Sequence, residues 1–96
     1  MTNTVKVDKE IQNRIRLCIF AYAYEFENES LVSDEDYDKL ARQINPTMKT
    51  GKESLDKFFA EEFDPNTGMW IYQHPDLERI RELYHLYKVA MYMHIC

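Results

Sequence analysis

Two carboxylates and a phenol occur together at Asp34, Tyr37 and Asp38, where a helix is expected to begin. Positions i, i+3 and i+4 share one face of a helix, so the three side chains would point the same way. Aromatic faces and carboxylates both favour a cationic aromatic ring, through cation–π contacts and charge-assisted hydrogen bonds. The spacing therefore places two carboxylates and an aromatic ring on one face, a combination that is compatible with such a ligand. The alternative is ordinary helix-start chemistry, in which first-turn acids suit the helix dipole.

The helix that would carry these residues has clear start and stop signals. Ser33 can accept a hydrogen bond from the amide of Asp36 as an N-cap, and Val32 and Tyr37 have the spacing of a hydrophobic staple. Asn45-Pro46 ends the pattern, because the residue before a proline avoids the α region.

A longer apolar helix is predicted before it, with Asp8 as N-cap and residues 1–7 frayed. Its helical spacing is carried by Ile11, Ile15, Cys18, Tyr22 and Phe26. The residues between these are also largely apolar, which predicts a helix that is central in a bundle. Tyr24 lies in this run, so its alternative role is that of a core residue.

Two more helices are expected towards the C-terminus. Thr50-Gly51-Lys52-Glu53 resembles a capping box, and His74-Pro75 would open the last helix with Pro75 at its first position. Between them, residues 69–72 have the composition of an extended segment or short strand. The predicted fold class is all-α: one domain over residues 8–96, about four helices, and a short strand or hairpin near Trp70.

The acidity of the chain is concentrated in one segment. Seventeen Asp and Glu face twelve Lys and Arg, giving a net charge of −5. Residues 25–38 hold seven acids and no base. This charge disfavours binding to nucleic-acid backbones or anionic membranes, and it leaves open a basic protein partner. The residues expected to dock such a partner are Glu25, Glu27, Glu29 and Glu35.

The sequence shows no catalytic or metal-binding set. There is no Gly-rich phosphate loop, and His94 and Cys96 alone do not make a closed metal site. Cys18 and Cys96 are interpreted as reduced thiols of a cytoplasmic protein. The longest apolar run, residues 17–23, is too short to span a membrane. We therefore expect no enzyme activity, no catalytic residue, no metal and no required cofactor.

Residues 11–44 resemble the N-terminal helical subdomain of bacterial NAD-dependent DNA ligases. The resemblance is carried by Tyr22-Ala23-Tyr24-Glu25 and by Val32-Ser33-Asp34-Glu35-Asp36-Tyr37-Asp38-Lys39-Leu40. In that family the subdomain binds the nicotinamide mononucleotide (NMN) half of NAD. The resemblance implies that Tyr24 and Tyr37 lie against the nicotinamide ring. It also implies that Asp34 and Asp38 accept hydrogen bonds from ribose hydroxyls or the carboxamide.

The chain also departs from that family. Glu25 stands where the family usually has Tyr or His, and the string Lys6-Val7-Asp8-Lys9 lacks the Gly of the ligase nucleophile motif. The sequence thus predicts a non-catalytic module that binds NMN, NAD or a related ligand. Two alternatives remain. One is an acidic interaction factor, such as a phage-encoded inhibitor of the anti-CRISPR or anti-restriction type. The other is a subunit that completes a split ligase.

Overall fold

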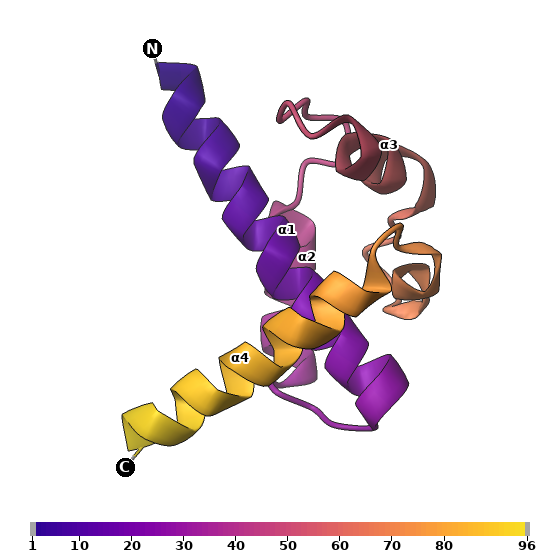
Figure 1. Ribbon diagram of the computed structural model, residues 1–96. Coiled ribbons are helices and arrows are strands. Elements are labelled where there is room, and N and C mark those ends of the chain that lie inside the picture. The colour runs from indigo at the N-terminus through magenta and orange to yellow at the C-terminus, as the bar shows by residue number, and fades with distance from the viewer. Residues whose placement is uncertain (1, 96) are drawn as a thin grey trace.

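The computed structural model describes residues 2–95, and the side chains of residues 5–92. It contains four α-helices and one 3-10 helix, and the described residues form no strand (Figure 1). The predicted all-α fold class is confirmed. The elements are α1 (Thr2–Glu27), α2 (Asp34–Gln43), α3 (Glu53–Glu62), η1 (Met69–Gln73) and α4 (Leu77–Ile95).

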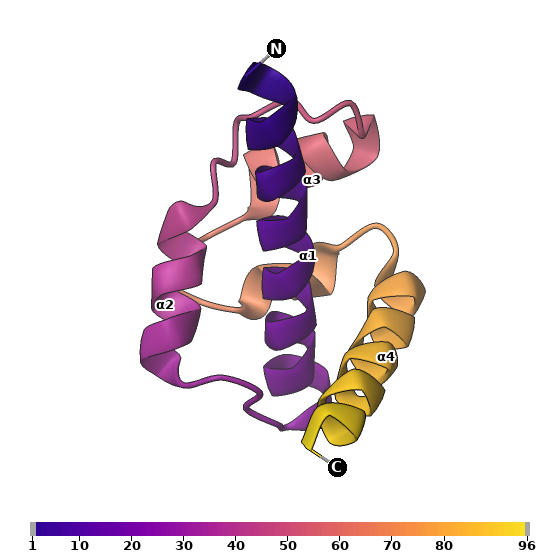
Figure 2. The same ribbon diagram turned by 90° about the vertical axis from the view of Figure 1, so that its left-hand side faces the viewer.

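Helix α1 is the centre of the bundle. Figure 2 shows α2 and α4 on opposite sides of it, and Figure 1 shows α4 crossing it. Every residue from Leu17 to Ala23 is buried, so this part of α1 is covered all round. The prediction of a central helix is confirmed, and the burial of these seven side chains provides much of the hydrophobic stabilisation.

The start of α1 differs from the prediction. The helix begins at Thr2, so the predicted N-cap at Asp8 is wrong. Residues 2–7, which the sequence predicts to be frayed, form the first turns of α1. Val5 in these turns is largely exposed. Exposed helical turns need no apolar stripe, so the sequence pattern does not reveal them. A helix that packing has nucleated further along can extend into such a segment, because each added residue gains a hydrogen bond.

Asn28 ends α1 and turns the chain towards α2. Its φ of 53° is in the left-handed region, which Asn tolerates better than most residues. The amide of Glu29 then donates to the carbonyl oxygen of Ala23 at 2.9 Å. At α2 the predicted cap is confirmed, because Ser33 Oγ accepts from the amide of Asp36 at 3.1 Å.

Arg14 of α1 is a buried arginine that joins three parts of the chain. Its Nε donates to Glu10 at 2.7 Å, and its Nη1 donates to Asp56 of α3 at 2.8 Å. Its Nη2 donates to the carbonyl oxygens of Asn45 and Met48 at 2.8 and 2.9 Å. The guanidinium therefore fixes the loop after α2, and also α3, against α1. The i,i+4 spacing of Glu10 and Arg14 is compatible with their ion pair, but nothing in the sequence indicates the contacts of Arg14 with the loop after α2 and with α3.

Two further contacts complete this cluster. Both carboxylate oxygens of Glu10 accept from the amide of Asn45, at 3.0 and 3.1 Å. The Arg14 guanidinium also lies 4.8 Å from the centre of the Phe59 ring. A buried charge is tolerated when it is paired and hydrogen-bonded in this way.

The start of α3 is capped differently from the prediction. Lys52 is the N-cap residue and its side chain makes no capping bond, so the capping box at Thr50 is wrong. Instead Thr50 donates to Asp56, from its amide at 2.8 Å and from its hydroxyl at 2.6 Å. Desolvation opposes ionisation of Asp56, but the bonds from Thr50 and Arg14 hold its pKa below the usual value.

The segment near Trp70 is the 3-10 helix η1, so the predicted strand or hairpin is wrong. Trp70 and Ile71 are adjacent and both buried, whereas Met69 and Tyr72 are exposed. A strand would send neighbouring side chains to opposite faces, and only a helical turn lets both reach one core. Trp70 packs against three rings, which are Phe58, Phe59 and Phe63.

Helix α4 begins later than predicted, and its last turns are exposed. Asp76 Oδ1 accepts from the amide of Arg79 at 3.1 Å and caps the helix, so Pro75 precedes the cap and is not the first helical residue. Ile80 and Tyr84 are buried, but the later turns leave the bundle and expose Leu86 and Tyr92. No helix among the described residues is both long and apolar enough to cross a bilayer.

We expect Arg14→Met to lower the free energy of unfolding by about 3–5 kcal/mol, since it leaves buried carboxylates without their cation. Denaturant unfolding followed by circular dichroism measures the change. Arg16→Met is the matched control, because Arg16 is exposed on the same helix. Equal stabilities of the two variants would contradict the role assigned to Arg14.

The effect of Arg14→Met should depend on pH. Because the folded-state pKa of Asp56 is lowered, its contribution is complete above the unfolded-state value of about 3.9 and is lost as the pH falls through the folded value. The stability gap between wild type and variant should therefore narrow below about pH 4. Unfolding curves measured at several pH values test this. A gap that stays constant down to about pH 3 would contradict it.

Candidate functional site

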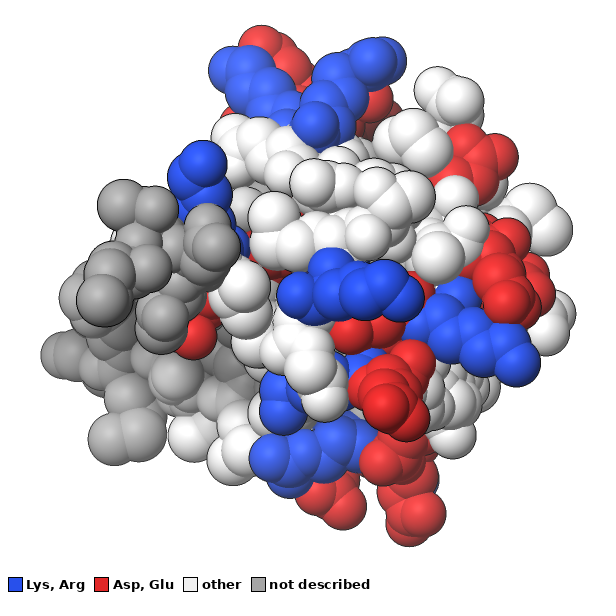
Figure 3. Space-filling view, turned by 90° about the horizontal axis from the view of Figure 1, so that it is seen from above, with Lys and Arg blue, Asp and Glu red and all other residues white. Residues whose placement is uncertain are grey.

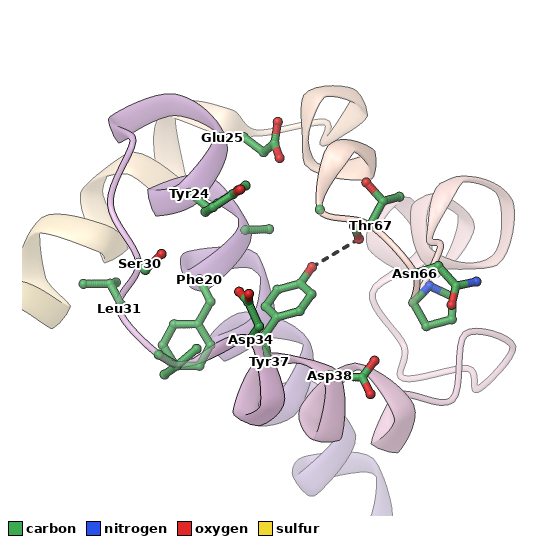
Figure 4. A pocket seen from close by; sticks show the side chains of 14 residues that line it. Phe20, Tyr24, Glu25, Ser30, Leu31, Asp34, Tyr37, Asp38, Asn66 and Thr67 are labelled. Atoms are coloured by element: carbon green, nitrogen blue, oxygen red, sulfur yellow. Dashed lines mark hydrogen bonds between the residues drawn. The ribbon is translucent and has the colours of Figure 1, made fainter.

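A cavity of about 320 Å³ lies between the end of α1, the start of α2 and the turn before η1 (Figure 4). All four residues predicted to bind a ligand line it, namely Tyr24, Asp34, Tyr37 and Asp38. Its size is at the small end of the range for ligand pockets, about 300–1,000 Å³. The remaining lining residues are Phe20, Ala21, Glu25, Ser30, Leu31, Val32, Pro65, Asn66, Thr67 and Gly68.

Tyr37 connects the two walls of this pocket. It comes from α2, is partly buried against the core, and donates its hydroxyl to the carbonyl oxygen of Thr67 at 3.3 Å (Figure 4). Burial raises the pKa of Tyr37 to about 12, so the phenol is neutral at physiological pH. Its oxygen can still accept a hydrogen bond from a ligand.

Tyr24 faces the pocket and is 58% exposed, although the seven residues before it are buried. The alternative interpretation of Tyr24 as a core residue is therefore wrong. An exposed ring on a rigid helix offers an aromatic face to a ligand at a low cost in conformational entropy.

The two aspartates differ in their surroundings. Asp34 is exposed in the first turn of α2, beside the pocket mouth. Asp38 is partly buried, and its Oδ2 accepts from Nε of Arg42 at 3.0 Å. This ion pair fixes the rotamer of Asp38. It engages one carboxylate oxygen and leaves the other to accept a further bond.

The remaining wall of the pocket was not foreseen in the sequence. Glu25, predicted to dock a protein partner, is half-buried and lines the pocket. Gly68 lies opposite: a Cβ at this position would be 3.5 Å from the Tyr37 hydroxyl and 3.6 Å from Glu25 Oε2. The composition of residues 64–68 predicts a turn, but only the fold brings that turn beside Tyr37.

The other predicted docking residues lie outside the pocket. Glu27 accepts from the Tyr22 hydroxyl at 3.1 Å, and the exposed Glu35 pairs with Lys39 at 3.5 Å. Glu29 accepts from the Tyr84 hydroxyl and from Lys88 of α4, the latter at 3.0 Å. The hydrogen bond from Tyr84, and after it the bond from Lys88, lowers the pKa of Glu29 below its usual value. Glu29 therefore serves as a tertiary contact between the α1–α2 link and α4.

The surface charges are mixed. On the face shown in Figure 3, Lys and Arg side chains lie among Asp and Glu and form no continuous basic area in the part described. Nucleic-acid binding through phosphates requires such an area.

A second cavity, of about 520 Å³, lies between α1, α3 and α4 and contains none of the predicted site residues. Its walls are mainly apolar, and its Arg14 is already engaged by the buried cluster. His74 at its edge accepts from the amide of Asp76, and burial lowers the pKa of its imidazole. Arg14 and His74 therefore act in the fold, and the smaller pocket, which holds all four predicted ligand-binding residues, remains the candidate site.

The described residues bring no three His, Cys, Asp or Glu side chains together as a metal site. The C-terminal pair His94 and Cys96 lies outside the described side chains. Cys18 is buried, and burial raises the pKa of its thiol well above the usual value, so it is a poor nucleophile.

Comparison of the chain with protein-family models, curated proteins and solved structures finds no match. The resemblance of residues 11–44 to the ligase subdomain therefore stays a prediction.

We expect Tyr37→Phe to cost about 0.5–1 kcal/mol of folding stability, the lower part of the range for a lost hydrogen bond. The cost is small because the Thr67 carbonyl keeps its bond from Trp70 Nε1 at 2.8 Å. Thermal unfolding measures the change, and Tyr92→Phe on the exposed end of α4 is the control. A loss of several kcal/mol would mean that Tyr37 has a larger structural role.

Proposed function

We propose that the protein is a small binding module that holds the nicotinamide part of NMN or NAD in the pocket beside Tyr37. The observation that carries this proposal is the convergence of Tyr24, Asp34, Tyr37 and Asp38 on one cavity. They come from two helices, and they are the residues that the resemblance to the ligase subdomain implies for the nicotinamide site. Helix-start chemistry alone accounts for Asp34 and Tyr37, but it does not account for the exposed ring of Tyr24 across the same cavity.

Each residue has a chemical part in this proposal. The exposed face of Tyr24 stacks on the nicotinamide ring, whose positive charge is attracted to aromatic faces. Tyr37 lies against the same ring from α2. Asp34 and the second oxygen of Asp38 accept hydrogen bonds from ribose hydroxyls or from the carboxamide. The module acts by binding, as a separate protein or as an accessory part of an enzyme, and we assign it to the cytoplasm.

The alternative, an acidic factor that docks on a basic host protein, has less support. Glu25 lines the pocket, and Glu29 is already held by Tyr84 and Lys88. Only Glu27 and Glu35 of the four predicted docking residues are exposed, and both have partners of their own. An acidic docking face would have its carboxylates directed outward and available to a partner.

Titration with NMN tests the proposed function. We expect chemical-shift changes centred on Tyr24 and Tyr37 in NMR spectra, and a tenfold or greater weakening in Asp38→Ala, the usual scale for a charge-assisted bond. Asp36→Ala is the matched control, because it removes the same charge from the same helix but does not line the pocket. No shift at millimolar concentrations of NMN, NAD or nicotinamide riboside would refute the proposal.

Gly68→Leu tests whether the ligand binds in this pocket, because it fills the pocket without removing a polar group. Gly68 has a φ of −102°, which any residue adopts, so the larger side chain adds no backbone strain. Its side chain would enter the space between Tyr37 and Glu25. NMN binding should be lost while the circular dichroism spectrum is kept. Retained binding would place the ligand elsewhere.

A further inference from the structure

The pocket beside Tyr37 carries charge of one sign only. Three carboxylates line it, from Glu25 on α1 and from Asp34 and Asp38 on α2, and no Lys, Arg or His is among the lining residues. Its other walls are aromatic, aliphatic or neutral polar groups. Such a lining attracts a cation and repels an anion.

Glu25 places one of these charges inside the cavity. Its Oε2 and the Tyr37 hydroxyl both lie within 3.6 Å of the point that a Cβ on Gly68 would occupy. The residue is half-buried, so its charge is screened less than that of an exposed side chain. A ligand that fills the cavity therefore lies close to this carboxylate.

Of the bases on α2, Arg42 offsets part of the charge of Asp38, and no base on α2 pairs with Glu25 or Asp34. Arg42 is paired with Asp38 at 3.0 Å, and Lys39 is paired with Glu35 at 3.5 Å. Of the four residues in these two pairs, only Asp38 lines the cavity. A phosphate monoester carries a charge of about −1.5 to −2 at pH 7, and it would find no cation in this lining to pair with.

We propose that the pocket selects a phosphate-free aromatic cation, the N-ribosylated pyridinium of nicotinamide riboside, over the corresponding nucleotide. This inference rests on the proposed function and names its ligand class. The positive ring is attracted to the Tyr24 face, to Glu25 and Asp34, and more weakly to Asp38, whose charge Arg42 partly offsets. The phosphate of a nucleotide is repelled by the same carboxylates. The riboside carries no negative group, so nothing on it is repelled by the carboxylates of the pocket.

Calorimetric titration with nicotinamide riboside, NMN and uncharged nicotinamide tests the proposal. We expect the riboside to bind about tenfold or more tightly than NMN, because a charge pair at pocket distances changes the free energy by about 1 kcal/mol or more. Uncharged nicotinamide should bind more weakly than the riboside. Added salt should weaken riboside binding and should narrow its advantage over NMN.

Glu25→Gln tests whether the carboxylate of Glu25 produces the preference for the riboside. We expect it to reduce the preference for the riboside by about threefold to tenfold, since it removes one of three pocket carboxylates. The matched control is Glu35→Gln, which changes the net charge equally on a neighbouring exposed residue outside the pocket. An equal effect in both variants would assign the preference to overall charge and would overturn the proposal.

The two proposals fail in different ways. NMN binding as tight as the riboside, or tighter, would overturn the selection of a phosphate-free cation and leave the proposed function intact. Binding of neither compound at millimolar concentration would overturn both. If Glu25→Gln fails to fold, the comparison of the three ligands on the wild-type protein still decides the question.

Discussion

The buried guanidinium of Arg14 is the interaction on which the arrangement of the elements depends. It binds Glu10, Asp56 and two carbonyl oxygens of the loop after α2, and it lies beside the Phe59 ring. Hydrophobic burial alone does not fix direction, whereas five directional hydrogen-bond donors do. By fixing where α2 ends and where α3 starts, this cluster also determines where the chain returns in the turn at residues 64–68.

That return forms one wall of the pocket. The turn carries Thr67, whose carbonyl oxygen accepts from both Tyr37 and Trp70. Trp70 packs in turn against the rings of Phe58 and Phe59 in α3 and of Phe63, the residue after α3. The pocket is thus assembled from two helices that are adjacent in sequence and a turn that arrives from the other side of the core. Its geometry depends on packing remote from it.

Features that depend on neighbouring residues could be predicted from the sequence. The Ser33 cap, the stop at Asn45-Pro46 and the central position of α1 follow from local spacing and apolar content. Features that depend on tertiary structure could not. For Arg14 only the pair with Glu10 has helical spacing, and its other partners are 31 to 42 residues away. The segment at Trp70 was wrongly predicted because β-favouring composition was overridden by the need to bury two adjacent side chains.

The candidate site divides in the same way. Its four predicted residues lie on two consecutive helices, whereas the sequence indicates Gly68 only as part of a turn and Glu25 only as a residue of the acidic segment. At Gly68 the open pocket lowers the stability of the fold. The backbone of Gly68 suits any residue, and a Cβ would make only ordinary contacts at 3.5–3.7 Å. Alanine there would stabilise the fold by about 0.4–1 kcal/mol, through the entropy of the unfolded chain, while filling part of the cavity. At this position stability and open volume are in direct competition, and the sequence has the residue that keeps the volume.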